Sequence, residues 1–139
     1  MIYIGIDTGT HTGFAVWDSH KREFKEVRTM QIHQAMQRVE YWSLVAEETG
    51  THLHITIEDA RQRKWYTGDT AAKAQGAGSV KRDASVWEGF LKDRGYNFTM
   101  VPPRKGMTKM NEGYFARLTG WTHRTSEHSR DAALLVFGK

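Results

Sequence analysis

The feature that most constrains the fold is a segment that begins at Ile2 and reads IYIGIDTGTHTGFAVWD. Isoleucine occupies every second position at the start of this segment, which is the alternation of a β-strand. A second apolar run follows at residues 14–17, and the two glycines between the runs suit a tight hairpin. Asp7 therefore lies at the end of the first strand, immediately before a turn.

Asp7 has more than one interpretation. An Asp at this place can simply stabilise the turn, because its side chain accepts hydrogen bonds from nearby backbone N–H groups. The letters DTGT also resemble the first phosphate motif of the sugar-kinase and actin-like ATPases. Those proteins hold a nucleotide between two domains, whereas 139 residues provide one domain of ordinary size. The length therefore weakens the ATPase interpretation.

The composition limits the chemistry further. The chain contains no cysteine, which excludes disulfides, Cys-ligated zinc and thiol nucleophiles, so any metal must be held by oxygen and imidazole. Lys and Arg together number 20 against 16 Asp and Glu, which favours an electropositive surface and a polyanionic partner. No stretch has the length of a membrane span or the pattern of a signal peptide, so we expect a cytoplasmic protein.

The rest of the chain alternates between strand and helix patterns. A third strand follows the hairpin and ends near residue 30, and later elements are expected as a helix from Ile32 to Gly50, a strand over 52–59, a long helix from an Asp69 cap to Arg94, a strand over 96–101, a short helix within 111–120 and a last helix over 126–138. This order predicts one α/β domain over residues 1–139. Its mixed five-stranded sheet, with three antiparallel meander strands and then parallel strands, is flanked by helices as in the RNase H-like fold.

Three acids occupy the ends of predicted elements. Asp7 ends the first strand, Glu58 ends the fourth, and Asp131 lies in the first turns of the last helix, with His128 three residues before it on the same helix face. The first and fourth strands would be neighbours, so these carboxylates would converge. Clustered carboxylates normally imply a divalent cation, and oxygen ligands suit Mg²⁺ or Mn²⁺.

Each of these residues also has an ordinary structural interpretation. Glu58 or its neighbour Asp59 could begin a loop, and His128 could cap or decorate an exposed helix turn. Asp131 is followed at once by the apolar run AALLVF, which places it at the edge of a buried helix face. The metal site would be absent only if all of these ordinary interpretations were true at once, which is much less favoured than any one of them alone.

The chain resembles the RuvC-like Holliday-junction resolvases, particularly their short phage-type members. IGIDTGTHTGFAVWD is similar to their first strand and hairpin, ITIEDAR to their fourth strand, and EHSRDAALL to their terminal His-x-x-Asp-Ala helix. The resemblance implies that Asp7, Glu58, His128 and Asp131 are the catalytic and metal-binding residues, holding two Mg²⁺ or Mn²⁺ ions. It also implies a homodimer that cuts two strands of a four-way junction.

Contacts with DNA are expected from two basic segments. Trp65 and Tyr66 suit stacking on bases, and the residues around them, Arg61, Arg63 and Lys64, suit phosphate contacts. Arg104, Lys105 and Lys109 lie where the family has catalytic or DNA-contacting lysines. Small residues at 71–80 could form the dimer contact or could pack on the chain's own sheet.

The expected function is a metal-dependent endonuclease that resolves four-way DNA junctions by hydrolysis, with water as the nucleophile and a role in recombination and repair. Other RNase H-like nucleases that act on branched DNA or RNA–DNA hybrids are the nearest alternative. A DNA-binding module without catalysis is a further one, although clustered acids do not favour binding to a polyanion. The compact chain and the resemblance suggest a phage or prophage origin.

Overall fold

The computed structural model describes residues 1–63, 71–104 and 109–139, without the side chains of residues 71–77. The elements are β1 (Ile2–Asp7), β2 (Thr12–Asp18), β3 (Glu23–Met30), α1 (Ile32–Glu48), β4 (Leu53–Glu58), the 3₁₀ turn η1 (Ala60–Gln62), α2 (Ala71–Arg94), β5 (Phe98–Val101), α3 (Glu112–Thr119) and α4 (Glu127–Leu134). No helix in these ranges is long and apolar enough to cross a membrane.

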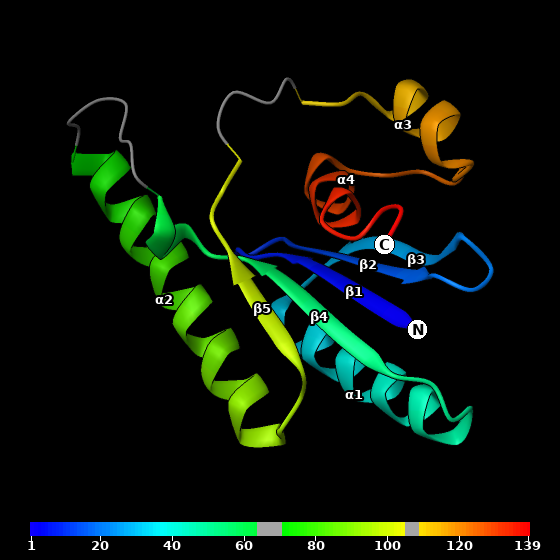
Figure 1. The fold of residues 1–139 in the computed structure, drawn as a ribbon. Coiled ribbons are helices and arrows are strands. Elements are labelled where there is room, and N and C mark those ends of the chain that lie inside the picture. Colours follow the sequence, from blue (N-terminus) through cyan, green and yellow to red (C-terminus); the bar gives the residue numbers. More distant parts are fainter. Residues whose placement is uncertain (64–70, 105–108) are drawn as a thin grey trace.

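The five strands form one sheet in the order β3-β2-β1-β4-β5 (Figure 1). β1 pairs antiparallel with β2, and β2 pairs antiparallel with β3, which makes the meander predicted from the first thirty residues. β4 and β5 join in parallel through the crossovers that contain α1 and α2. The predicted mixed sheet of three meander strands followed by parallel strands is confirmed.

Helices cover both faces of the sheet. One core lies under α1 and α2 and contains the alternating isoleucines of β1 with Phe14 and Trp87. The other core lies under α3 and α4 and contains Trp17, Phe24 and Phe115. Because strand side chains alternate between faces, the residues of β1 that miss the first core, Gly5 and Asp7 among them, face α4.

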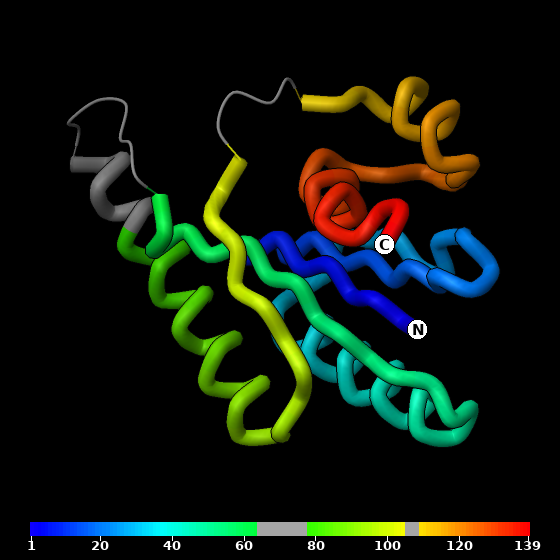
Figure 2. Tube along the Cα trace, viewed as in Figure 1, coloured from blue at the N-terminus to red at the C-terminus, as the bar shows by residue number. Residues whose placement is uncertain are grey.

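The last helix lies directly against the backbone of β1 and β2. A Cβ atom at Gly5 would lie 2.1 Å from the Ala132 carbonyl oxygen, and one at Gly13 would lie 1.9 Å from the His128 carbonyl oxygen. Figure 2 shows this crossing of the end of the chain over its beginning. The two glycines therefore set the height of α4 above the strand that ends in Asp7.

The structure shortens one predicted helix and leaves the predicted cap of another untested. The final helix ends at Leu134 instead of continuing to residue 138, because Leu135 and Val136 form i→i+3 hydrogen bonds and Gly138 has a left-handed φ of 80°. The proposed Asp69 cap lies outside the described residues. Within α2, a Cβ at Gly78 would meet no atom within 4 Å, so packing on the chain's own sheet does not explain that glycine.

Candidate functional site at the ends of β1 and β4

The sheet places Asp7 and Glu58 side by side at the carboxyl ends of β1 and β4, on the same face. Ile6 pairs with Ile57 in the parallel β1–β4 ladder, so Asp7 and Glu58 occupy the next positions along the two strands. Adjacent strands are about 4.8 Å apart, and residues at matching positions point the same way. Alternation turns both carboxylates toward α4, on the face opposite to the isoleucine core.

The start of α4 is fixed by its own side chains. Ser126 is the N-cap and accepts a hydrogen bond from the Ser129 N–H, while the Ser129 hydroxyl accepts one from the Ser126 N–H. The Ser126 hydroxyl also contacts the Thr29 hydroxyl of β3. This anchoring brings His128 Nδ1 to 3.1 Å from Asp7 Oδ2, although 121 residues separate the two in sequence.

The electrostatics of the acids reflect their shared environment. Burial raises the pKa of Asp7, the hydrogen bond from His128 opposes this, and the negative charge of Asp131 raises it further. Burial likewise raises the pKa of Glu58, and the charges of Asp7 and Asp131 add to the effect. The three carboxylates therefore repel one another, which shows that they lie in one electrostatic site.

Cationic side chains surround these acids. Lys109 Nζ lies 3.5 Å from Asp131 Oδ2 and also pairs with Glu127. A cavity of about 160 Å³ is lined by Arg63, Arg104 and Lys109 together with Glu58 and Asp131. Three of the residues predicted to contact DNA therefore lie beside the predicted metal ligands.

The side chains of the candidate site have the chemistry that a hard divalent cation prefers. They supply carboxylate oxygens and one imidazole, and a bound cation would relieve the mutual repulsion of the acids. As positioned, however, no group of three or more acidic or histidine side chains in the described ranges is compact enough to hold an ion. His128 bonds to Asp7 and Lys109 pairs with Asp131, so ligand rotation would have to accompany metal binding.

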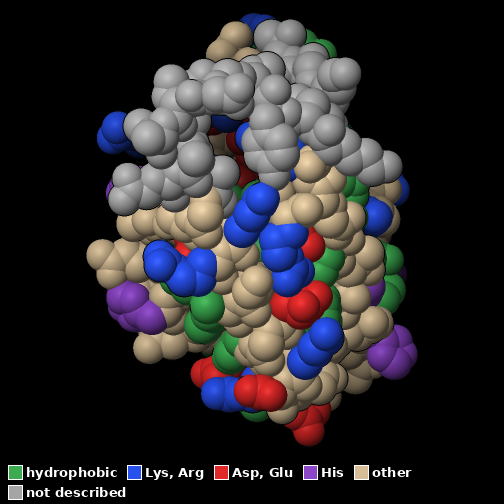
Figure 3. Space-filling view, turned by 90° about the vertical axis from the view of Figure 1, so that its left-hand side faces the viewer, with side chains coloured by type: hydrophobic (Ala, Val, Ile, Leu, Met, Phe, Trp, Pro, Cys, Tyr) green, Lys and Arg blue, Asp and Glu red, His purple; other side chains and the backbone are tan. Residues whose placement is uncertain are grey.

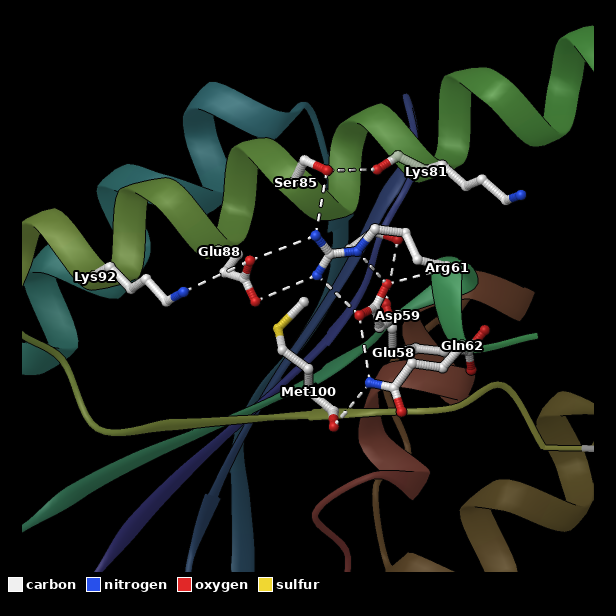
Figure 4. Close-up of polar contacts among 10 residues, drawn as sticks. Glu58, Asp59, Arg61, Gln62, Lys81, Ser85, Glu88, Lys92 and Met100 are labelled. Atoms are coloured by element: carbon white, nitrogen blue, oxygen red, sulfur yellow. Dashed lines mark hydrogen bonds and ion pairs between the residues drawn. The ribbon is translucent and has the colours of Figure 1, made fainter. Parts of the chain in front are cut away.

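Arg61, one of the residues predicted to contact DNA, is held by carboxylates of its own chain. Its guanidinium donates to both oxygens of Asp59 and to Glu88 of α2, and it also reaches the Ser85 hydroxyl (Figure 4). Gln62 completes the group by donating to Asp59 and to the Met100 carbonyl. We call Asp59, Arg61 and Glu88 the Arg61 cluster.

The surface around α2 carries charges of both signs. Figure 3 shows this side of the molecule, where basic and acidic side chains intermingle below the undescribed segment. The Arg61 cluster is one instance, since two carboxylates flank its guanidinium. Lys64, Trp65, Tyr66 and Lys105 lie outside the described residues, and their DNA contacts stay predictions.

Sequence reasoning missed two residues near the acids. The rings of His11 and His128 are stacked with their centroids 6.5 Å apart, and the Thr8 hydroxyl donates to the Glu58 carbonyl at 3.4 Å. Both belong to the turn that follows Asp7. The sequence did contain a signal for them, namely the polar residues of that turn. A turn that follows the carboxyl end of β1 must lie close to Asp7, the last residue of the strand.

Comparison with known proteins identifies the fold. No known family matches the sequence, and neither does any curated protein. Among solved structures, the chain is similar to T. thermophilus RuvC in complex with a Holliday junction substrate, with a TM-score of 0.56 and 14% identity over 99% of this chain and 92% of that one. The protein therefore has the RNase H-like fold of RuvC, as the element order predicts.

Proposed function

We propose that this protein is a metal-dependent endonuclease that cuts branched DNA, with four-way junctions as its preferred substrate. The observation that carries the proposal is the convergence of Asp7, Glu58 and Asp131, each from a different element, with His128 bonded to Asp7. The fold supports the same class of reaction, and the similar structure holds a Holliday junction.

In this proposal, Asp7, Glu58, His128 and Asp131 hold two Mg²⁺ or Mn²⁺ ions. When bound, such ions activate water on one side of a phosphodiester and stabilise the leaving oxygen on the other. The protein's own contribution is to keep the carboxylates on one face at the sheet edge. His128 holds Asp7 in place through Nδ1 and is suited to binding an ion or moving a proton.

The basic side chains at the site have a separate task. Arg63, Arg104 and Lys109 line the cavity beside Glu58 and Asp131, where they would neutralise the phosphates that approach the acids. Without them, three carboxylates would repel the substrate. Their placement makes an acidic site compatible with a polyanionic partner.

A dimer is part of the proposal, because symmetric cutting of a four-way junction needs two sites. The open space at Gly78 is compatible with a partner helix at that position of α2. Light scattering at micromolar concentration, with and without junction DNA, should show the dimer. A monomer under both conditions would contradict this part of the proposal.

The deciding experiment offers labelled four-way junction, duplex, flap and RNA–DNA hybrid to the protein in Mg²⁺ and in Mn²⁺. We expect symmetric cuts in the junction and little cleavage of duplex. Preferential cleavage of flap or hybrid would reassign the protein to another nuclease class of the same fold. Junction binding without cleavage in either metal would identify a binding module.

A further inference from the structure

A groove of about 940 Å³ lies beside β3, which is an edge strand of the sheet. Its walls come from β3, from α1 and from the segment that leads into α4. The side chains that give it its character are Lys25, Arg28, Arg38, Trp42, Trp121 and Arg124. None of them belongs to the set that surrounds the acids of the candidate active site.

The groove has an excess of positive charge. Glu26 is the one acid among its lining residues, and its side chain is 7% exposed. That carboxylate already binds Arg38 through two nitrogens, pairs with Arg28 at 3.1 Å and accepts a hydrogen bond from the Trp42 indole. Two guanidiniums around one satisfied carboxylate leave a net positive charge, and Arg28 is 59% exposed to solvent.

The groove also offers donors that nothing in the described chain satisfies. Arg124 forms no ion pair or hydrogen bond with the residues that the structure describes. A guanidinium is always charged and suits phosphate oxygens, so these donors favour an anionic ligand.

The position of the groove relates it to the acids. Thr125, Ser126 and Ser129 are among its lining residues, and they lie at the start of α4, where Ser126 is the N-cap. His128, which bonds to Asp7, is in the same helical turn. A chain of phosphates lying in the groove would therefore lead directly to the candidate active site.

We infer that this groove binds the phosphodiester backbone of one DNA arm next to the strand that is cut. The inference rests on the proposed function and adds a second contact surface to it. An extended polyanion fits because the basic side chains are spread along a strand, a helix and a loop, where a single small anion could reach only some of them. Arg28 and Arg124 are the residues with most freedom to contact phosphates.

The test compares the variants Arg28→Ala and Arg124→Ala with the matched control Arg117→Ala, which removes an Arg of α3 outside the groove. Binding to four-way junctions is measured in Ca²⁺ at several salt concentrations, with arms of increasing length. We expect each groove variant to bind about 5-fold more weakly at 0.1 M salt and to reduce the salt slope by about 1. The control should match the wild type.

The arm-length series makes the result specific. Wild-type affinity should rise as the arms lengthen enough to fill the groove, and the double variant R28A/R124A should lose that gain while keeping its thermal unfolding midpoint. Groove variants that match R117A at every arm length, with a wild type that binds junctions, would overturn the inference alone. A wild type that fails to bind junctions would instead overturn the proposed function.

Discussion

The guanidinium of Arg61 donates two parallel hydrogen bonds to the Asp59 carboxylate, from Nε to Oδ1 at 2.8 Å and from Nη2 to Oδ2 at 2.9 Å. Asp59 directly follows Glu58, and Arg61 also binds Glu88 of α2. Bidentate pairs of this kind are strong and directional. The Arg61 cluster therefore ties the end of β4, where Glu58 lies, to the long helix beside it.

Replacing the carboxylate of this pair should weaken the fold. We expect Asp59→Asn to lower the free energy of unfolding at pH 7 by about 2 kcal/mol, because Asp59 is 3% exposed and its loss leaves Arg61 with less compensation. Arg61 lowers the pKa of Asp59, so this stability is present above the ordinary carboxyl pKa and is lost as the pH falls below it. Urea unfolding at pH 7 and pH 3 measures both effects.

The matched control is Asp93→Asn on the same helix as Glu88. Asp93 is exposed and has no ion pair among the described residues, so its change should shift stability by less than about 0.5 kcal/mol at either pH. Equal effects of the two substitutions would show that the Arg61 cluster contributes nothing beyond general surface charge.

Arg61 and Arg63 should behave differently toward DNA although they are two residues apart. Arg63 is exposed and lines the cavity beside Glu58, so Arg63→Ala should reduce the salt slope of junction binding by about 1. The guanidinium of Arg61 is held by two carboxylates, so Arg61→Ala should leave that slope unchanged and lower stability instead. A reduced slope in both variants would support the phosphate contact that the sequence predicts for Arg61.

Adding one methyl group under α4 should disturb both fold and site. Gly5→Ala and Gly13→Ala place a Cβ about 2 Å from helix carbonyl oxygens, so each should destabilise the protein by at least about 1–3 kcal/mol. Gly89→Ala, in α2 with open space around it, should instead stabilise by about 0.5–1 kcal/mol. Denaturant unfolding of the three variants checks the opposite signs.

Removing the charge of Glu58 should stabilise the metal-free protein at neutral pH. Burial and the nearby acids raise the pKa of Glu58, so its ionised form is disfavoured in the folded state. The protonated Glu58 side chain therefore contributes stability that is fully present below the pKa of Glu58 in the unfolded chain. This contribution is lost as the pH rises through the pKa of Glu58 in the folded protein. In the presence of a chelator, Glu58→Gln should therefore need a higher urea concentration to unfold than the wild type at pH 7. The difference between the two unfolding midpoints should disappear near pH 3.

Changes at the acids should separate binding from cleavage. Asp7→Asn should abolish cleavage and leave junction binding intact or stronger, because the phosphates then meet less negative charge. His128→Ala should be milder, and Mn²⁺ should partly relieve its loss. Cleavage by Asp7→Asn within tenfold of wild type would contradict the two-ion proposal. Equal losses in both variants with every metal would give His128 a more central role.

The sequence predicts most of the sheet because its signals are local. The alternation of β1, the glycines after Asp7 and the proline at 102 each act within a few residues, and parallel pairing of β1 with β4 follows from the helix between them. The convergence of Asp7 with Glu58 then needs only strand parity. The end of the last helix was not predicted, because its closing i→i+3 hydrogen bonds form within an apolar run that continues the helical pattern.

The partners of individual side chains could not be predicted in the same way. Arg61 beside aromatic and basic residues is typical of a DNA-binding loop, yet Glu88, its partner 27 residues later, is invisible to any local pattern. The groove beside β3 combines residues from three distant segments. Such arrangements depend on how elements pack, which neither periodicity nor spacing encodes.

The 121-residue separation between Asp7 and His128 has a consequence for how the protein folds. Although His128 and Asp131 share α4, the acid site needs β1, β4 and α4 together, and each of these pairings must first close a long loop. A partly folded chain therefore carries the acids but not their arrangement. Under the proposed function, DNA cleavage would therefore begin only after β1, β4 and α4 have assembled.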